Sequence, residues 1–593
     1  MLIFEPMKAI SRFLQNVFAL DLRSLALLRV GVAFVLIYDL LERWTDLEAH
    51  YTDLGILPRE ALWKYFSSWN LTFHSMSGSW QIEAILFAIA LVFAILLLLG
   101  YKTRFATIVC WIFLISVQNR NPVVCYGGDS VLRMLLFWGM FLPWGARFAF
   151  DTVAHGIKSG NNRFVGVGTV GYAIQISCIY VFTALLKSGS EWREDFTAVY
   201  YAVSLDELKT PFTDFLYDGP AWILTFLTVA VLFWETIGPL ALLTPKWRVR
   251  LFGVVGFVLL HLGFGMFMRL GIFPFVSAIC IVGFVPGEAW DRLGKRWRSK
   301  RASGLLIYYD GTCGFCGKFV QLVKVFLVLP SVGIKTGADD QEVFSIMESK
   351  KSWVITDDRG EEFTDFSAIV RLMKASPWAR WIAPIVGLFT PLGRKLYYIL
   401  STRRETLPQL ARPRREFKMQ RGPLGTAIGT FCILFVIAIN VVIVFEDDLK
   451  IPPGLKEFAQ TSKITQNWGM FAPYPYKSDG WYVMPAELRD GTRLDLFSEK
   501  PVTFDKPELV SAMFKTTRWS KYYRSLRRPK YRKLMPYYIK YMVRDWNRNH
   551  ESEEWVSEFR MVFMKEKTLP NYEVPEIEEI ILWRYKRPSR SRK

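Results

Sequence analysis

Two cysteines three positions apart, Cys313 and Cys316, are the residues of this chain whose types and spacing indicate chemistry most directly. They stand in the stretch YYDGTCGFCGKFVQLVKVF, which begins at Tyr308. The run before them, from Gly304, has the β-branched and aromatic residues of a strand, and the run after them, from Lys318, has helical apolar spacing. A dithiol between a strand and a helix indicates thiol–disulfide exchange.

The pattern of strand, turn, Cys-x-x-Cys and helix predicts the redox-active half of a thioredoxin-like unit. Cys313 is expected at the helix N-terminus, where free backbone N–H groups and the helix dipole favour the thiolate. Cys316 is expected one turn inside, where it can resolve a mixed disulfide, so Cys313 is the predicted nucleophile. A structural zinc site and an inert pair are the alternatives. Zinc normally needs four ligands, and no second Cys-x-x-Cys or nearby histidine pair is present, so no metal is expected.

The composition indicates an integral membrane protein. Of 593 residues, 51% are hydrophobic and 16% aromatic, and the mean hydropathy is +0.19, which is too apolar for a soluble multidomain enzyme. The net charge of +20 would suggest nucleic acid in a soluble protein. Beside apolar spans it indicates positive-inside loops and contact with membrane lipid, so nucleic acid is not an expected partner. The seven cysteines are too few and scattered for a secreted disulfide scaffold.

Nine stretches approach the length needed to cross a bilayer, two of them short, and together they predict an α-helical transmembrane bundle. They cover approximately residues 24–41, 81–100, 105–118, 130–148, 170–187, 221–243, 251–269, 272–285 and 425–445.

The charges of the connecting loops predict the orientation of the chain. With a cytoplasmic N-terminus, the inside connections include YKTR, PKWRVR and DRLGKRWRSKR, whereas the outside connection over residues 188–220 is rich in Asp and Glu. This bias is the one that the positive-inside rule expects. It predicts a multi-pass protein of a bacterial-type inner membrane, with the dithiol in the cytoplasm and the tail from residue 447 outside.

The dithiol segment resembles the DCC family of thiol–disulfide oxidoreductases, named for an Asp and two Cys, here Asp310, Cys313 and Cys316. The stretches SWVITDDRGEEFTDFSAIVRLM and PLGRKLYYILSTRR extend the resemblance over about residues 304–404. It implies a thioredoxin-like fold, a protein thiol or disulfide as partner, and Asp310 as an orienting or proton-accepting group. A turn or helix-capping role is the alternative for Asp310. The dithiol itself requires no cofactor. No proline immediately precedes the expected strand at Trp353, where typical thioredoxins place a cis-proline.

A second resemblance covers about residues 20–290, together with a stretch of the tail. The segments RVGVAFVLIYDLLERWTDLEAHYTDLGILPR, QNRNPVVCYGGDSVLRMLLFWGMFLP, IQISCIYVFTALLKSGSEW and TQNWGMFAPYP look like the horizontally transferred transmembrane (HTTM) domain related to vitamin K-dependent gamma-carboxylases. Carried over to this chain, Lys187 occupies the place of the lysine assigned as the carboxylase base, and a quinone or quinol is a possible cofactor. The carboxylase histidine near NRNPVVCYGGD is absent.

Two further ionisable residues, Glu235 and His261, lie within predicted spans, where such groups usually face the bundle interior. With Lys187 they form a possible membrane site. The alternatives are a lysine that reaches the lipid interface at a helix end, a structurally satisfied histidine, and a glutamate paired with another buried polar group.

Four segments are therefore expected: an HTTM-like bundle over 1–290, a DCC-family domain over 304–404, a final span over 425–446, and an outer β-rich, basic tail over 447–593. In the tail, GWYVMPAELRDGTRLDLF predicts a β-hairpin with an Asp490-Gly491 turn. The stretch KYYRSLRRPKYRKLMPYYIKYMVR interleaves basic and aromatic residues in a pattern that suits a lipid interface.

Three classes of function fit these observations. The first is a membrane-anchored thiol–disulfide oxidoreductase. The second is a carboxylase-like membrane enzyme that acts on a lipid-soluble quinol or an exported polypeptide, with the dithiol supplying reducing equivalents. The third is a non-enzymatic membrane scaffold or transporter.

Overall fold

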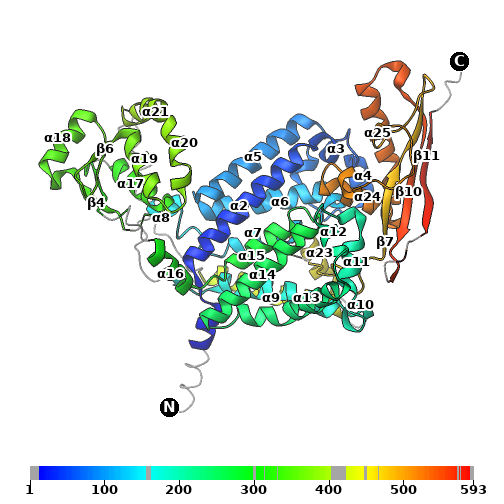
Figure 1. Ribbon diagram of the computed structural model, residues 1–593, viewed down its shortest axis with the longest axis horizontal. Coiled ribbons are helices and arrows are strands. Elements are labelled where there is room, and N and C mark those ends of the chain that lie inside the picture. The colour runs from blue at the N-terminus through cyan, green and yellow to red at the C-terminus, as the bar shows by residue number, and fades with distance from the viewer. Residues whose placement is uncertain are drawn as a thin grey trace, which may run out of the picture.

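The structure is a computed structural model with three parts along its longest axis (Figure 1). A helical bundle lies in the centre, a small α/β domain on one side of it, and a tail domain with a β-sheet on the other. The structure describes residues 12–154, 162–297, 304–312, 314–329, 331–402, 422–445, 451–464, 466–570 and 576–587, together with Ala302 and Glu573.

Six helices among the described residues are long and apolar enough to cross a membrane. They are α2 (Leu22–Trp44), α5 (Trp80–Leu99), α9 (Val167–Leu186), α13 (Ala221–Leu242), α14 (Trp247–Phe267) and α22 (Pro423–Val444). The pair α15 (Phe273–Val282) and α16 (Gly287–Trp297), bent by 87°, would make a seventh span. These helices are compatible with a multi-pass membrane protein.

The expectation of nine spans is not confirmed, because three of the expected stretches form helices that do not qualify on their own. They are α6 (Thr103–Arg120), α7 (Gly127–Gly139) and α15. At about 1.5 Å per residue, α7 and α15 rise only about 20 Å and 15 Å, short of a hydrocarbon core of about 30 Å. Almost every residue of α7 is buried. It is therefore a central core helix rather than a lipid-facing one.

The bundle has two ends that carry different structure. At one, the strands β1 (Leu20–Asp21) and β2 (Arg163–Phe164) pair beside the starts of α2 and α9. The helix α16 leaves the bundle here and is tied to α2 by an Arg23–Asp291 ion pair of 2.7 Å. We call this the α16 end. We call the opposite end, where α2 and α9 finish, the tail end.

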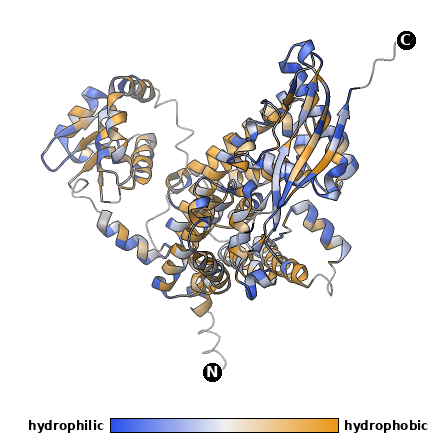
Figure 2. Cartoon of the chain, turned by 45° about the vertical axis from the view of Figure 1, so that its right-hand side comes forward, coloured by the Kyte–Doolittle hydropathy of each residue, from blue (hydrophilic) through white to orange (hydrophobic). Residues whose placement is uncertain are grey.

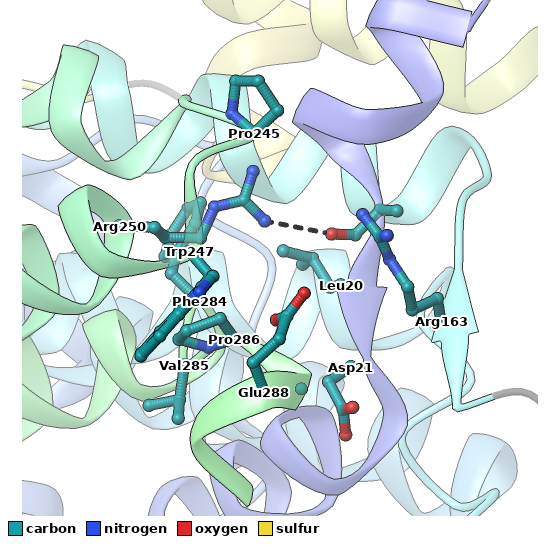
Figure 3. A pocket seen from close by; sticks show the side chains of 12 residues that line it. Leu20, Asp21, Arg163, Pro245, Trp247, Arg250, Phe284, Val285, Pro286 and Glu288 are labelled. Atoms are coloured by element: carbon teal, nitrogen blue, oxygen red, sulfur yellow. Dashed lines mark hydrogen bonds between the residues drawn. The ribbon is translucent and has the colours of Figure 1, made fainter. Parts of the chain in front are cut away.

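The connections at the α16 end are closely packed. Figure 3 shows Arg250 pointing toward the chain before α2, where its guanidinium donates to the backbone carbonyls of Ala19 and Val17. The cavity between these segments has a volume of about 20 Å³, which is room for about one water molecule. This cavity is therefore too small to hold an organic substrate.

Short helices surround both ends. Next to the α16 end lies α8 (Phe150–Ala154), and toward the tail end lie α3 (Leu47–Tyr51), α4 (Arg59–Tyr65), α10 (Ser190–Arg193), α11 (Ala198–Ser204) and α12 (Thr213–Tyr217).

The α/β domain contains one four-stranded sheet in the order β4-β3-β5-β6. Strands β3 and β4 are parallel, while β5 runs antiparallel to both β3 and β6. The elements are β3 (Leu306–Tyr309), α17 (Gly314–Phe326), β4 (Gly333–Thr336), α18 (Gln341–Lys350), β5 (Val354–Thr356), β6 (Glu362–Thr364), α19 (Asp365–Ala375), α20 (Ala383–Leu388) and α21 (Thr390–Thr402). The domain thus contains the strand and helix expected around the dithiol, β3 and α17, together with a β5–β6 hairpin followed by α19.

The tail domain is built on an antiparallel five-stranded sheet, in the order β11-β10-β8-β9 with β7 also paired to β10. Its elements are α23 (Pro453–Ser462), β7 (Ser478–Val483), β8 (Pro485–Leu488), β9 (Arg493–Asp495), α24 (Thr517–Leu526), α25 (Met535–Asn549), β10 (Val556–Lys567) and β11 (Ile577–Lys586). The pairing of β8 with β9 confirms the predicted hairpin around Asp490-Gly491.

The basic and aromatic stretch of the tail was predicted to lie at a lipid interface, but several of its aromatic rings lie in the core of the tail domain. Its aromatic side chains on α24 and α25, such as Tyr522, Tyr523 and Tyr538, are buried in a core that includes residues of the tail sheet. These rings therefore stabilise the tail domain from within and are not available to a lipid interface.

Candidate functional site

The dithiol segment has the local structure that its sequence predicts. Strand β3 ends at Tyr309, and α17 begins at Gly314. Cys316 lies in the first turn of α17 and is partly buried. Cys313, the predicted nucleophile, lies outside the described residues. The position of Cys316 near a helix N-terminus agrees with the expected arrangement.

Asp310 shapes the turn between the strand and the helix. Its carboxylate accepts hydrogen bonds from the backbone N–H of Thr312, at 3.0 Å, and from the Thr312 hydroxyl, at 2.6 Å. This geometry gives the turn-forming role of Asp310 a direct structural basis. Its role as a proton acceptor for the dithiol stays a prediction.

The first turns of α17 pack closely on the sheet beneath them. A Cβ atom at position 317 would lie 2.9 Å from the Tyr309 ring, so Gly317 permits the close approach of helix and strand. Two residues later, the ring of Phe319 lies 5.5 Å from the ring of Trp353. These contacts fix where the start of α17 lies, and hence where Cys316 lies.

The other end of α17 touches the bundle. The ring of Phe326 lies 5.5 Å from the ring of Phe150 in α8, and the Phe326 carbonyl accepts a hydrogen bond from the indole of Trp378. The α/β domain is therefore held at the α16 end of the bundle, through the end of α17 opposite to Cys316.

Two of the three residues of the possible membrane site meet each other. Lys187 follows the last residue of α9, at the tail end, and its Nζ lies 2.5 Å from Oε2 of Glu235 in α13. Both side chains are buried. The ammonium also lies 4.3 Å from the centre of the Trp192 ring. Each charge has a partner inside the protein, which is the arrangement expected of a structural ion pair.

His261, the third residue, has a different partner. Its Nε2 lies 2.7 Å from the hydroxyl of Tyr180 in α9, while its Nδ1 has no hydrogen-bond partner among the described residues. Among the described residues, no hydrogen bond or ion pair joins His261 directly to Lys187 or Glu235. Because Tyr180 and Lys187 are seven residues apart on one helix, the two pairs lie about 10 Å apart along α9.

A segment of the tail covers this region. The indole of Trp192 donates to the carbonyl of Phe471, at 2.8 Å, and the N–H of Gly189 donates to the carbonyl of Pro473, at 3.1 Å. The stretch WGMFAPYP thus lies across the tail end of α9. The sequence of this stretch resembles part of the HTTM domain but did not predict where the stretch lies.

A buried charge cluster that the sequence did not predict joins α2, α7 and α24. Arg43 donates to Asp39 and Asp129, and Arg518 of the tail donates to the same two carboxylates. All four side chains are at most 1% exposed. Burial lowers the pKa of Arg518, but Asp129 and Asp39 more than offset this, so its pKa is raised above the usual value. The cluster joins the tail to the bundle, and ionisable residues within the apolar runs were the available signal.

No group of three or more His, Cys, Asp or Glu side chains is placed to hold a metal ion in the part of the chain that the structure describes.

Residues 307–410 match the model of a protein family described as DCC1-like thiol-disulfide oxidoreductase. This match supports the DCC part of the resemblance and a thiol–disulfide oxidoreductase role for the domain. No curated protein and no solved structure matches the chain. The resemblance of residues 20–290 to the HTTM domain has no such support and stays a prediction.

Proposed function

We propose that this protein is a membrane-anchored thiol–disulfide oxidoreductase that uses Cys313 and Cys316 to reduce a disulfide in a partner protein. The observation that carries the proposal is the family match over 307–410, which includes both cysteines, with Cys316 in the first turn of a helix that directly follows a strand.

The proposed reaction transfers two electrons. The Cys313 thiolate attacks one sulfur of the partner disulfide, forms a mixed disulfide and releases the first partner sulfur as a thiolate. Cys316 then loses its proton and attacks the sulfur of Cys313, which closes the Cys313–Cys316 disulfide and releases the second partner sulfur. The released thiolates take up protons, so the dithiol is oxidised and the partner disulfide is reduced.

The packing of α17 favours a partner in the aqueous phase. Phe326 contacts the bundle, and Cys316 lies ten residues earlier, or about 15 Å along the helix. A protein that approaches the start of α17 therefore need not displace the contact between the domain and the bundle.

We further propose that the α16 end faces the cytoplasm of a bacterial-type cell. The loops at this end carry basic residues, including Lys102, Lys246 and Arg248, as the positive-inside rule expects of cytoplasmic loops. The cytoplasm keeps thiols reduced, so the resting state would be the dithiol, ready to reduce a partner.

The test is a non-reducing gel of acid-quenched cells that express single variants. Cys316→Ser should trap a mixed disulfide between Cys313 and the partner, because the resolving thiol is absent. Cys313→Ser should trap none, and Cys125→Ser, which leaves the dithiol intact, should behave as the wild type. Equal trapping by Cys316→Ser and Cys313→Ser would show that the assignment of the nucleophile is wrong. No adduct with either would refute the proposed reaction.

A carboxylase-like reaction in the bundle is a second candidate, because Lys187 and Glu235 form a buried pair at a helix end. Lys187→Arg should keep the ion pair and the fold, since a guanidinium also pairs with a carboxylate, but it cannot act as a base. A quinol-dependent activity of the purified protein that survives Lys187→Arg would exclude Lys187 as the base.

A further inference from the structure

The α/β domain carries a large exposed apolar surface on its last helices. Eight side chains between residues 378 and 396 are 42–78% exposed although all are large and apolar. We call them the α20–α21 face: Trp378, Trp381, Ile382, Ile385, Leu388, Phe389, Leu392 and Leu396. Figure 2 shows hydrophobic colour on helices of this domain as well as on the bundle.

These residues are not the outward side of an ordinary amphipathic helix. The inward sides of α20 and α21 are apolar too: Ala383 is fully buried, and a Cβ at Gly393 would lie 2.3 Å from the Phe366 ring. Apolar side chains therefore lie on the outward as well as the inward sides of these helices, which is typical of helices that pack in a core or against a membrane. The face exposes on the order of 800 Å² of apolar area, more than the few hundred Å² usual for a soluble monomer.

The charges around the face identify what covers it. From Trp378 to Thr402 the sequence has no Asp or Glu, but it has Arg380, Arg394 and Lys395, all of them exposed. The Arg380 guanidinium lies over the Trp381 ring, and Arg394 also pairs with Asp365. Tryptophan with neighbouring basic residues is the composition of surfaces that lie at the headgroup level of a bilayer with anionic lipids.

The position of the domain brings this face to a membrane that the same chain crosses. The contact between Phe326 and Phe150 holds the domain at the α16 end, and Trp378, the first residue of the face, bonds to Phe326. Figure 1 shows α20 on the side of the domain that faces the bundle and α18 on the far side. After Thr402 only 20 residues precede α22, a candidate span.

We propose that the α20–α21 face lies in the headgroup layer of the leaflet at the α16 end and that its occupant is the bilayer, with a preference for anionic lipids. The domain is then fixed to the membrane at three places: by α16, by α22 and by this face. The docking would restrict the rotation of the domain about its two connections, so that the dithiol keeps one orientation relative to the membrane surface.

Photocrosslinking from single positions tests the proposal on the full-length protein. The photoreactive residue p-benzoyl-phenylalanine replaces Leu388, which is 78% exposed on the face, or Phe344, which is 44% exposed on α18 of the same domain. Both changes keep an apolar side chain and leave the dithiol intact. The purified proteins are illuminated in nanodiscs of phosphatidylcholine with phosphatidylglycerol, and the adducts are identified by mass.

We expect lipid adducts at Leu388 and none above background at Phe344. In the Leu388 protein, the double change Arg380→Gln and Lys395→Gln should lower the adduct yield, by up to about fivefold for each basic side chain, given about 1 kcal/mol per residue near an anionic surface. Nanodiscs of phosphatidylcholine alone should lower it in the same way.

Three results would overturn the proposal. They are equal lipid adducts at the two positions, no lipid adduct at Leu388, and a crosslink from Leu388 to a second copy of the chain, which would make the face a contact between protomers. None of these readouts depends on the redox reaction, so they leave the test of the dithiol unaffected.

Discussion

His50 lies in α3, where it is buried against the ring of Trp519 at 4.6 Å between centroids. Neither of its ring nitrogens has a hydrogen-bond partner among the described residues. Burial lowers the pKa of His50 to about 3, and the nearby cations Arg518 and Arg43 contribute to the lowering. The folded protein therefore holds this imidazole neutral, whereas the unfolded chain binds a proton at its ordinary pKa of about 6.5.

The stability of the fold should consequently fall as the pH drops below about 6.5, by up to about 1.4 kcal/mol per pH unit from this residue. His50→Phe keeps an aromatic ring beside Trp519 and sacrifices no hydrogen bond of the described structure. We expect the variant to lose less thermal stability than the wild type between pH 7 and pH 5. The measurement is the midpoint of thermal unfolding in detergent. Parallel curves for the two proteins would contradict the prediction.

The sequence alone predicts the surroundings of some residues but not of others. The strand and the helix on either side of Asp310 and Cys316 could be predicted because they are consecutive in the sequence, so local spacing determines them. Arg518 and Asp129 are 389 positions apart, and nothing local in either segment indicates the other. A buried charge is costly unless it is paired, so a partner for Asp129 is expected. Which residue is that partner depends on the packing of the tail against the bundle.

At the level of elements, the contact between α9 and α13 includes the Lys187–Glu235 ion pair. Removing one partner of a buried pair leaves the other charge buried and uncompensated, at a cost of about 3–5 kcal/mol. Lys187→Met and Glu235→Leu should therefore each destabilise the bundle strongly. The double variant Lys187→Met/Glu235→Leu should recover most of the loss, because no buried charge remains.

Thermal unfolding of the four proteins in detergent gives the coupling between the two sites. The matched control is Arg493→Ala, which breaks the exposed Arg493–Glu487 pair on β8 and β9 and should cost no more than about 1 kcal/mol. If the single variants at Lys187 and Glu235 are as stable as the wild type, the pair does not stabilise the bundle, and the prediction is contradicted.

The lengths of the elements show where hydropathy ceases to be informative. The apolar run over 130–148 predicts one span, but α7 ends at Gly139. A Cβ at that position would lie 2.1 Å from the Trp144 ring, so the chain turns back where this indole packs against the helix. The hydropathy of the sequence shows that α7 and the segment after it are both apolar, but it does not reveal the turn between them. The six long helices lack such interruptions, and their existence was predicted.

On the scale of the whole molecule, the two predicted sites belong to opposite ends of the bundle. The α/β domain is held at the α16 end, whereas Lys187 follows the last residue of α9 at the tail end. The 20 residues of α9 extend about 30 Å. The distance between the two sites therefore excludes direct electron transfer from the dithiol to a substrate bound at Lys187. A joint mechanism would need a mobile carrier such as a quinol.

The same arrangement makes a prediction about sidedness. If the long helices cross a membrane, the α/β domain and the tail domain lie on opposite sides of it, because they are attached at opposite ends of the bundle (Figure 1). Two exposed positions report on this: Ser349 at the end of α18 and Arg532 between α24 and α25. Each is replaced by cysteine in turn and treated with a membrane-impermeant maleimide.

In intact cells, the reagent should label Arg532→Cys and miss Ser349→Cys, and permeabilised cells should show labelling of both. The native Cys125 is a weak competitor, because burial raises the pKa of its thiol to about 11 and little reactive thiolate forms. Labelling of both positions in intact cells would contradict the arrangement. Labelling of Ser349→Cys alone would invert the orientation and place the dithiol in an oxidising compartment, where forming disulfides is the more favourable direction.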